Sequence, residues 1–124
     1  MVTILSLVSI LFTTEPAQLP HTPDTYEAII LQDDLTQIIS YYDNGKIREM
    51  GYLLKGKQEG CWCKYSETGN LLAKAYYNNG FKAGSWKIYA NDGKLKYEIT
   101  YKNGIRQFAK SYDENEELIS YLLH

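Results

Sequence analysis

A repeat of 24 residues is the sequence feature that most constrains how this chain can fold. Gly45, Gly69 and Gly93 are spaced by 24 residues. Other glycines, a series of tyrosines and a Gly-x-Trp segment keep the same period. Because one unit of this length buries too little apolar surface to fold alone, the repeat predicts that neighbouring units stack into a continuous core. The further members of the series are Gly56, Gly80 and Gly104; Tyr41, Tyr65 and Tyr89; Gly60 and Gly84; and Trp62 and Trp86.

Each unit is predicted to consist of two β-strands. Within residues 95–101, Leu, Tyr, Ile and Tyr alternate with Lys, Glu and Thr. This period of two is typical of a strand with one buried face. Asn-Gly and Asp-Gly pairs, which accept the positive φ of tight hairpin turns, follow the predicted strands at intervals of about twelve residues. The pattern predicts a run of antiparallel hairpins, and only the N-terminal run could be helical.

The last unit carries a one-residue deletion and is expected to cap the stack, as terminal repeats do. Tyr112 and Leu118 take the places of Tyr89 and Leu95, and Glu116 replaces the turn glycine. We therefore expect an all-β fold, an elongated single antiparallel sheet of tandem 24-residue β-hairpin repeats. Its predicted parts, within one domain at residues 25–124, are a divergent first hairpin at 25–42, repeats at about 41–65, 65–89 and 89–112, and a cap at 112–124.

A sheet of this kind has no second layer, so large side chains lying along its surface must supply the buried area. The chain has twelve tyrosines and two tryptophans. These side chains bury much area and keep a polar group for hydrogen bonding. Their abundance is consistent with a meandering sheet that no helix covers.

These residues resemble the MORN-type repeat, in the bacterial variant found in YwqK-family antitoxins. The matching segments are residues 65–89 and 89–101, preceded by 41–65, and the resemblance covers roughly residues 41–121. It implies an elongated antiparallel sheet that contacts a protein or a membrane, and it brings no catalytic residues. The antitoxin name implies a small protein that blocks a toxin by binding it.

The first residues suggest export. Residues 2–12 carry no charge, and a run of eleven is too short for a membrane-spanning helix, which needs about 20 residues. Residues 1–14 therefore resemble a signal segment, followed by a proline-containing linker at 15–24. No basic residue precedes the run, and no clear cleavage site follows it. The alternative is a cytoplasmic protein with a misassigned start or a buried first strand.

Charge is segregated along the chain. All thirteen Lys and Arg lie within residues 46–110, together with five acids, so this stretch carries about +8. Such a stretch could attract an anionic membrane, nucleic acid or an acidic protein. Nucleic acid is the least favoured partner, because the lysines are scattered over turns and both faces. Lysines that protect exposed strands are the ordinary alternative.

No constellation for catalysis or for a cofactor is present. The two histidines, His21 and His124, lie near the chain ends, and no glycine-rich phosphate loop occurs. Cys61 and Cys63 flank Trp62 and should point to the same face of a strand. A metal there would need two further ligands, and a disulfide would need strained geometry, so a structural or incidental role is expected. We predict a non-enzyme without cofactor, metal or small-molecule substrate.

A candidate interaction surface follows from the repeat. The two tryptophans fall on equivalent positions of one face, where they either pack or form an aromatic binding strip. The tyrosines three residues later should lie on the opposite face. The predicted function is protein binding by an exported or envelope-associated module; the alternatives are binding to anionic membranes and inhibition of a cognate toxin. The candidate residues are Trp62, Trp86, Tyr65, Tyr89, Lys64, Lys74, Lys82 and Lys87.

Overall fold

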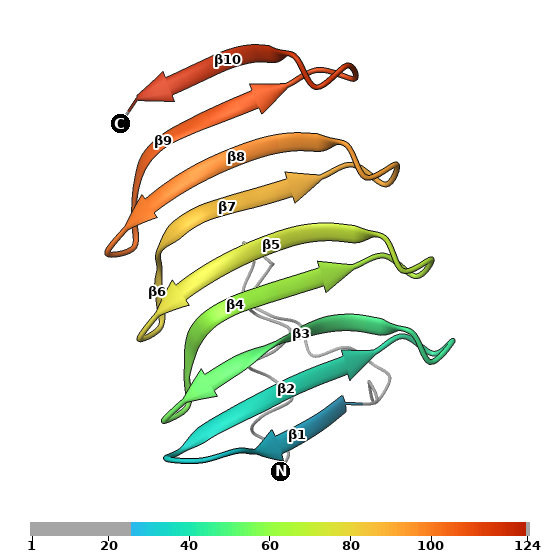
Figure 1. The fold of residues 1–124 in the computed structure, drawn as a ribbon, viewed down its shortest axis with the longest axis vertical. Coiled ribbons are helices and arrows are strands. Elements are labelled where there is room, and N and C mark those ends of the chain that lie inside the picture. The colour runs from blue at the N-terminus through green and yellow to red at the C-terminus, as the bar shows by residue number, and fades with distance from the viewer. Residues whose placement is uncertain (1–25, 124) are drawn as a thin grey trace, which may run out of the picture.

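The molecule is one layer of antiparallel strands that follow one another along the chain (Figure 1). The computed structural model describes residues 26–123. The predicted all-β fold with a single elongated antiparallel sheet is confirmed, whereas the segments expected at residues 1–14 and 15–24 lie outside the described residues. The strands are β1 (Tyr26–Ile30), β2 (Leu35–Tyr41), β3 (Ile47–Leu54), β4 (Lys57–Tyr65), β5 (Leu71–Asn78), β6 (Phe81–Lys82), β7 (Gly84–Tyr89), β8 (Leu95–Lys102), β9 (Ile105–Tyr112) and β10 (Leu118–Leu123).

The turns at the two ends of the strands are of different kinds. At one end, called here the edge with the four-residue turns, each turn is closed by two backbone hydrogen bonds, as in Tyr42 N to Lys46 O at 2.8 Å and Gly45 N to Tyr42 O at 2.9 Å. The last turn of this series has Glu116 at φ +61° in place of glycine, as the sequence predicted. Its carboxylate accepts a hydrogen bond from Leu95 N at 2.9 Å, which joins this turn to the preceding repeat.

At the opposite end of the strands, three two-residue turns have positive φ at both central residues. These are Lys55-Gly56, Asn79-Gly80 and Asn103-Gly104, and the first residue of each pair has φ +50°; Asp33 and Asp34, between β1 and β2, also have positive φ. Asparagine tolerates this left-handed conformation, whereas lysine has no side-chain group that compensates for it. The Lys55-Gly56 turn is therefore locally strained.

We expect Lys55→Asn to raise the free energy of unfolding by about 0.5–1 kcal/mol, since asparagine relieves part of the left-handed strain. The measurement is chemical unfolding followed by fluorescence. Asn79→Lys makes the reverse change in the next repeat and should lower stability by a similar amount. A loss of stability in Lys55→Asn would contradict this explanation.

The core is a line of aromatic rings along one face of the sheet, here called the core face. Trp62 is fully buried, and Tyr77 and Trp86 are each 6% exposed. Tyr77 lies between the two indoles, with ring centroids 6.5 Å from Trp62 and 5.1 Å from Trp86, and Tyr101 continues the line 5.1 Å beyond Trp86. Edge-to-face and tilted contacts at these distances are favourable for aromatic rings. Stacking between repeats therefore supplies the core, as a solenoid requires.

The two indoles are held in the same way. Trp62 Nε1 donates to Tyr52 O at 3.1 Å, and Trp86 Nε1 donates to Tyr76 O at 2.9 Å. Both acceptors lie ten residues earlier in the chain, in the adjacent strand. A buried indole N–H needs such a partner, so the hydrogen bond fixes the position of each tryptophan in its repeat.

Small residues make room for Trp62. Ala75 lies directly opposite it in the pairing of β4 with β5. On the β3 side lies Gly51, where a Cβ atom would be only 2.0 Å from the indole ring. The ring therefore packs against bare backbone, while Ile38 and Leu53 complete the buried cluster.

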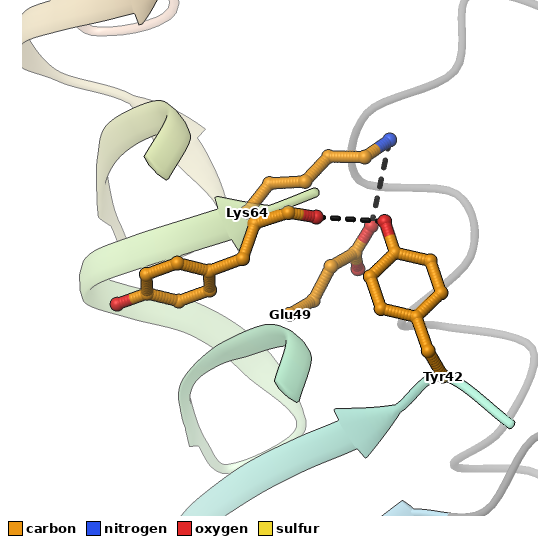
Figure 2. Close-up of polar contacts among 4 residues, drawn as sticks. Tyr42, Glu49 and Lys64 are labelled. Carbon is orange, nitrogen blue, oxygen red and sulfur yellow. Dashed lines mark hydrogen bonds and ion pairs between the residues drawn. The ribbon is translucent and has the colours of Figure 1, made fainter. Parts of the chain in front are cut away.

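Hydrogen bonds also join successive repeats at the edge with the four-residue turns. Figure 2 shows Tyr42 reaching from the end of β2, where its hydroxyl donates to Tyr65 O at 2.7 Å. Asn44 Nδ2 donates to Glu67 O at 2.9 Å, and Asn70 Nδ2 donates to Asn91 O at 2.8 Å one repeat later. These contacts fix the spacing of neighbouring turns, which supports the stacking seen in the core.

Candidate binding surface

The pairing of strands distributes the candidate residues over two faces. Trp62 and Trp86 lie on the core face with the other rings of the aromatic line. Since Trp62 is completely inaccessible and Trp86 nearly so, the burial supports their packing role, and the exposed candidates must be sought elsewhere.

Two of the candidate lysines also belong to the core face. Lys82 Nζ lies 4.9 Å from the centre of the Trp86 ring and 5.1 Å from that of Tyr101, so it caps the aromatic line through cation–π contacts. Lys64 Nζ is 3.8 Å from an oxygen of the buried Glu49, as Figure 2 shows. A buried carboxylate is costly unless it is paired, so Lys64 contributes to the fold.

The other two lysines lie on the opposite side of the sheet. Lys74 of β5 and Lys87 of β7 are direct partners, and Lys87 in turn faces Glu98 of β8. The same row continues to Lys110 of β9. We call this side the lysine face and define it by Lys74, Lys87 and Lys110, which are all partly exposed. Three lysines and one acid across four strands give this row a net positive charge.

The candidate tyrosines lie on the lysine face. The Tyr65 hydroxyl donates to Met50 Sδ at 3.9 Å, and Met50 pairs with Cys63 in the register of β3 and β4. Tyr89 stands one period after Tyr65 and, like it, directly follows a shift in the strand register, so the repeat places it on the same face. The contact of Tyr65 with Met50 agrees with the expectation that these tyrosines point away from the tryptophans.

The sequence interpretation missed an aromatic group at the C-terminal end of the lysine face. Phe108 and Tyr121 stack with ring centroids 5.7 Å apart and an angle of 29° between the rings. Lys110 Nζ lies 5.7 Å from the centre of the Phe108 ring. The one-residue deletion shifts these residues relative to the earlier repeats, so comparison of the repeats does not identify them. The feature of the sequence that indicates this group is the alternation of Phe108, Lys110 and Tyr112 along β9.

Several tyrosines of the sheet have raised pKa values, so the stability of the fold should depend on pH in the alkaline range. Burial, helped by the nearby Glu49 carboxylate, raises the pKa of Tyr77 well above its ordinary value. Burial also raises the pKa of Tyr65, and of Tyr112, where Glu98 adds to the effect. These tyrosines have a higher pKa in the folded state than in the unfolded state. Their protonated form therefore stabilises the fold fully at pH values below the unfolded-state pKa, and this stabilisation is lost as the pH rises through the folded-state pKa.

We therefore expect the free energy of unfolding to fall as pH rises above about 10, the ordinary pKa of tyrosine. Tyr77→Phe should flatten this decline, because phenylalanine has no proton to lose. The measurement is urea unfolding at a series of pH values. Parallel declines in wild type and in Tyr77→Phe would contradict a role for Tyr77.

The described residues contain no arrangement typical of an active site. Neither histidine lies within residues 26–123, and no three side chains of His, Cys, Asp or Glu gather there as a metal site. A shallow hollow of about 320 Å³ beside the turn after β7 is lined mainly by apolar groups, including Leu95 and Ile119. Among the described residues, no helix could cross a membrane.

Comparison with known proteins identifies the repeat. A family model described as MORN repeat variant matches three segments, residues 37–53, 58–79 and 82–103. No curated protein is significantly similar to the chain. Each matched segment contains most of one hairpin, so the sequence match and the strand pairing describe the same unit.

Proposed function

Over residues 37–103 the chain belongs to the MORN repeat variant family, and from this premise we propose that it is a non-enzymatic module that binds an acidic protein with its lysine face. The described residues form a repeat sheet in which no three side chains of His, Cys, Asp or Glu gather as a metal site, and what this sheet offers to other molecules is its surface. Of its two faces, the core face is occupied in its middle part by the aromatic line of Trp62, Tyr77 and Trp86. The lysine face remains for a partner.

One observation carries the proposal: Lys74 and Lys87 lie directly opposite each other. Like charges at directly opposite positions do not favour strand pairing, and Glu98 is the one acid beside them among the described residues, so the row keeps a net positive charge. Carboxylates of a partner would complement this charge. Tyr76 and Tyr121, 37% and 48% exposed, flank the row and provide the amphipathic rings that are enriched in protein interfaces.

The test is capture from the native organism with wild type and with Lys74→Glu/Lys87→Glu. We expect a stoichiometric acidic partner that the double variant loses, with affinity reduced by at least about tenfold for two reversed charges. Its free energy of unfolding should stay within about 1 kcal/mol of wild type, because both lysines are partly exposed. The matched control is Lys55→Glu/Lys57→Glu, which makes the same charge change in the turn after β3 and at the first residue of β4. Equal capture by both double variants would contradict the proposal.

Binding to an anionic membrane is the second candidate, favoured by the same row of lysines. It predicts adsorption to vesicles containing phosphatidylserine that weakens steeply with salt. Binding to such vesicles without any protein partner would replace the first proposal. Absence of binding at low salt would remove this second candidate.

Two finer proposals concern where the module acts and what it blocks. Export is supported by the uncharged run at residues 2–12, and mass spectrometry of the mature N-terminus tests it, since an unprocessed terminus would argue against a cleaved signal.

Inhibition of a cognate toxin is supported by the resemblance to antitoxins of this repeat class. It predicts that the captured partner is toxic when expressed alone and harmless when co-expressed with this protein.

A further inference from the structure

Two cysteines and a methionine lie on the lysine face, where the pairing of Cys63 with Lys74 makes them neighbours of the row of lysines. Cys61 and Cys63 lie two residues apart on β4, so their side chains share a face, and their Sγ atoms are 3.8 Å apart. Both cysteines are free and partly exposed. Met50 of β3 lies directly opposite Cys63. From this arrangement we propose that Cys61, Cys63 and Met50 bind a single soft monovalent metal ion, Cu(I).

The separation of the two sulfurs matches what one metal ion requires. Two thiolates bound at about 2.3 Å with an angle of about 110–120° between the bonds are about 3.8–4.0 Å apart. The pair already has this separation, so an ion could bind without movement of the strand. A disulfide would instead require the sulfurs to approach to about 2.05 Å across neighbouring positions of an extended strand.

The third donor is placed by Tyr65. Its hydroxyl lies 3.9 Å from Met50 Sδ, and Tyr65 itself stands two residues after Cys63 on the same strand. The thioether and the thiol of Cys63 therefore share one neighbour. Two thiols and a thioether on the same face make a donor set of sulfur only.

This donor set selects the ion. Thiolate and thioether ligands favour soft ions such as Cu(I). Structural zinc sites have four nitrogen, sulfur or carboxylate ligands, and no third side chain of His, Cys, Asp or Glu joins the pair within the described residues. Two thiolates and Cu(I) carry one net negative charge, and Lys74, which lies directly opposite Cys63 in the pairing of β4 with β5, would compensate it.

The repeat itself does not require these cysteines. One period later, Ser85 and Lys87 occupy the same places in β7, and the strand pairs normally. Since the fold does not require Cys61 and Cys63, these two residues can serve a function other than packing. The comparison also indicates that serine at the first position and lysine at the second leave the strand pairing intact.

Binding must displace the thiol protons. Two thiols that bind one Cu(I) release two protons. Affinity should therefore increase with pH, and proton release measured in weak buffer gives the number of thiolates bound.

The experiment is anaerobic titration of the reduced full-length protein with Cu(I), in competition with a chromogenic Cu(I) chelator. We expect one ion per chain, release of two protons, and a thiolate-to-copper absorption band in the near ultraviolet. Cys61→Ser/Cys63→Ser should remove all three signals. Met50→Leu, which conserves volume, should weaken binding by about tenfold or more and remove one sulfur from the X-ray absorption spectrum.

Several results would overturn the site. These are retention of Cu(I) by the double serine variant, unchanged affinity in Met50→Leu, or tighter binding of Zn²⁺ than of Cu(I). Thermal unfolding of each metal-free variant separates loss of the site from loss of the fold. The two proposals can fail separately, since the double serine variant removes the thiols and keeps both Lys74 and Lys87.

Discussion

Gly51→Ala is expected to destabilise the protein by at least about 3 kcal/mol, a loss at the upper end of what overpacking causes. The new Cβ would lie 2.0, 2.3 and 2.4 Å from three atoms of the Trp62 ring. The ring cannot easily move away, because its Nε1 donates a hydrogen bond to Tyr52 O and Ala75 packs opposite it. The change should appear as a large shift in the urea midpoint, or as failure to fold.

Gly56→Ala is the matched control for this substitution. Gly56 has φ +78°, and no atom lies within 4 Å of the position that an added methyl group would occupy. Alanine there adds backbone strain of about 1–2 kcal/mol without a clash. Gly51, in contrast, has no positive φ to explain its identity. The clash predicts that Gly51→Ala costs much less in a Trp62→Leu background. Equal effects of the two glycine substitutions would refute the steric explanation.

Trp62→Ala should cost about 3–5 kcal/mol, the usual loss for a buried aromatic side chain. The indole is completely buried, and its removal leaves a cavity between β3 and β5 as well as an unused acceptor at Tyr52 O. Since domains are stable by only about 5–15 kcal/mol, this single change removes a large part of the total.

Tyr76→Ala provides the comparison for Trp62→Ala. Tyr76 lies on the opposite face of the neighbouring strand and is 37% exposed, so its truncation should cost about 1 kcal/mol or less. Unfolding by heat and by urea, followed by circular dichroism, measures both variants. Similar losses in the two would mean that the aromatic line is not the main source of stability.

The fold was predictable because its signals are local and occur in every unit. Asparagine or aspartate followed by glycine marks the turns, and alternation of side chains marks the strands. Even the irregular last turn followed from alignment, since Glu116 stands where the earlier repeats have glycine and adopts positive φ. Repetition supplied several independent observations of the same unit.

The candidate surface was predicted only in part, because the residue types do not state which face they occupy. Lys64, Lys74, Lys82 and Lys87 were grouped together, but two of them pack on the core face and two lie on the lysine face. Phe108, stacked on Tyr121, was not identified as part of a surface at all.

The sequence by itself determined the period, the turns and the order of the strands, since each depends on the conformational preferences of a few adjacent residues. The tertiary structure alone decided which side of the sheet collects the buried groups and which residues meet across strands. A strand offers two faces, and a shift of one residue in pairing exchanges them. Gly51 beneath Trp62, Lys74 opposite Lys87 and Met50 opposite Cys63 all depend on that register, which is fixed by the packing of whole repeats against one another.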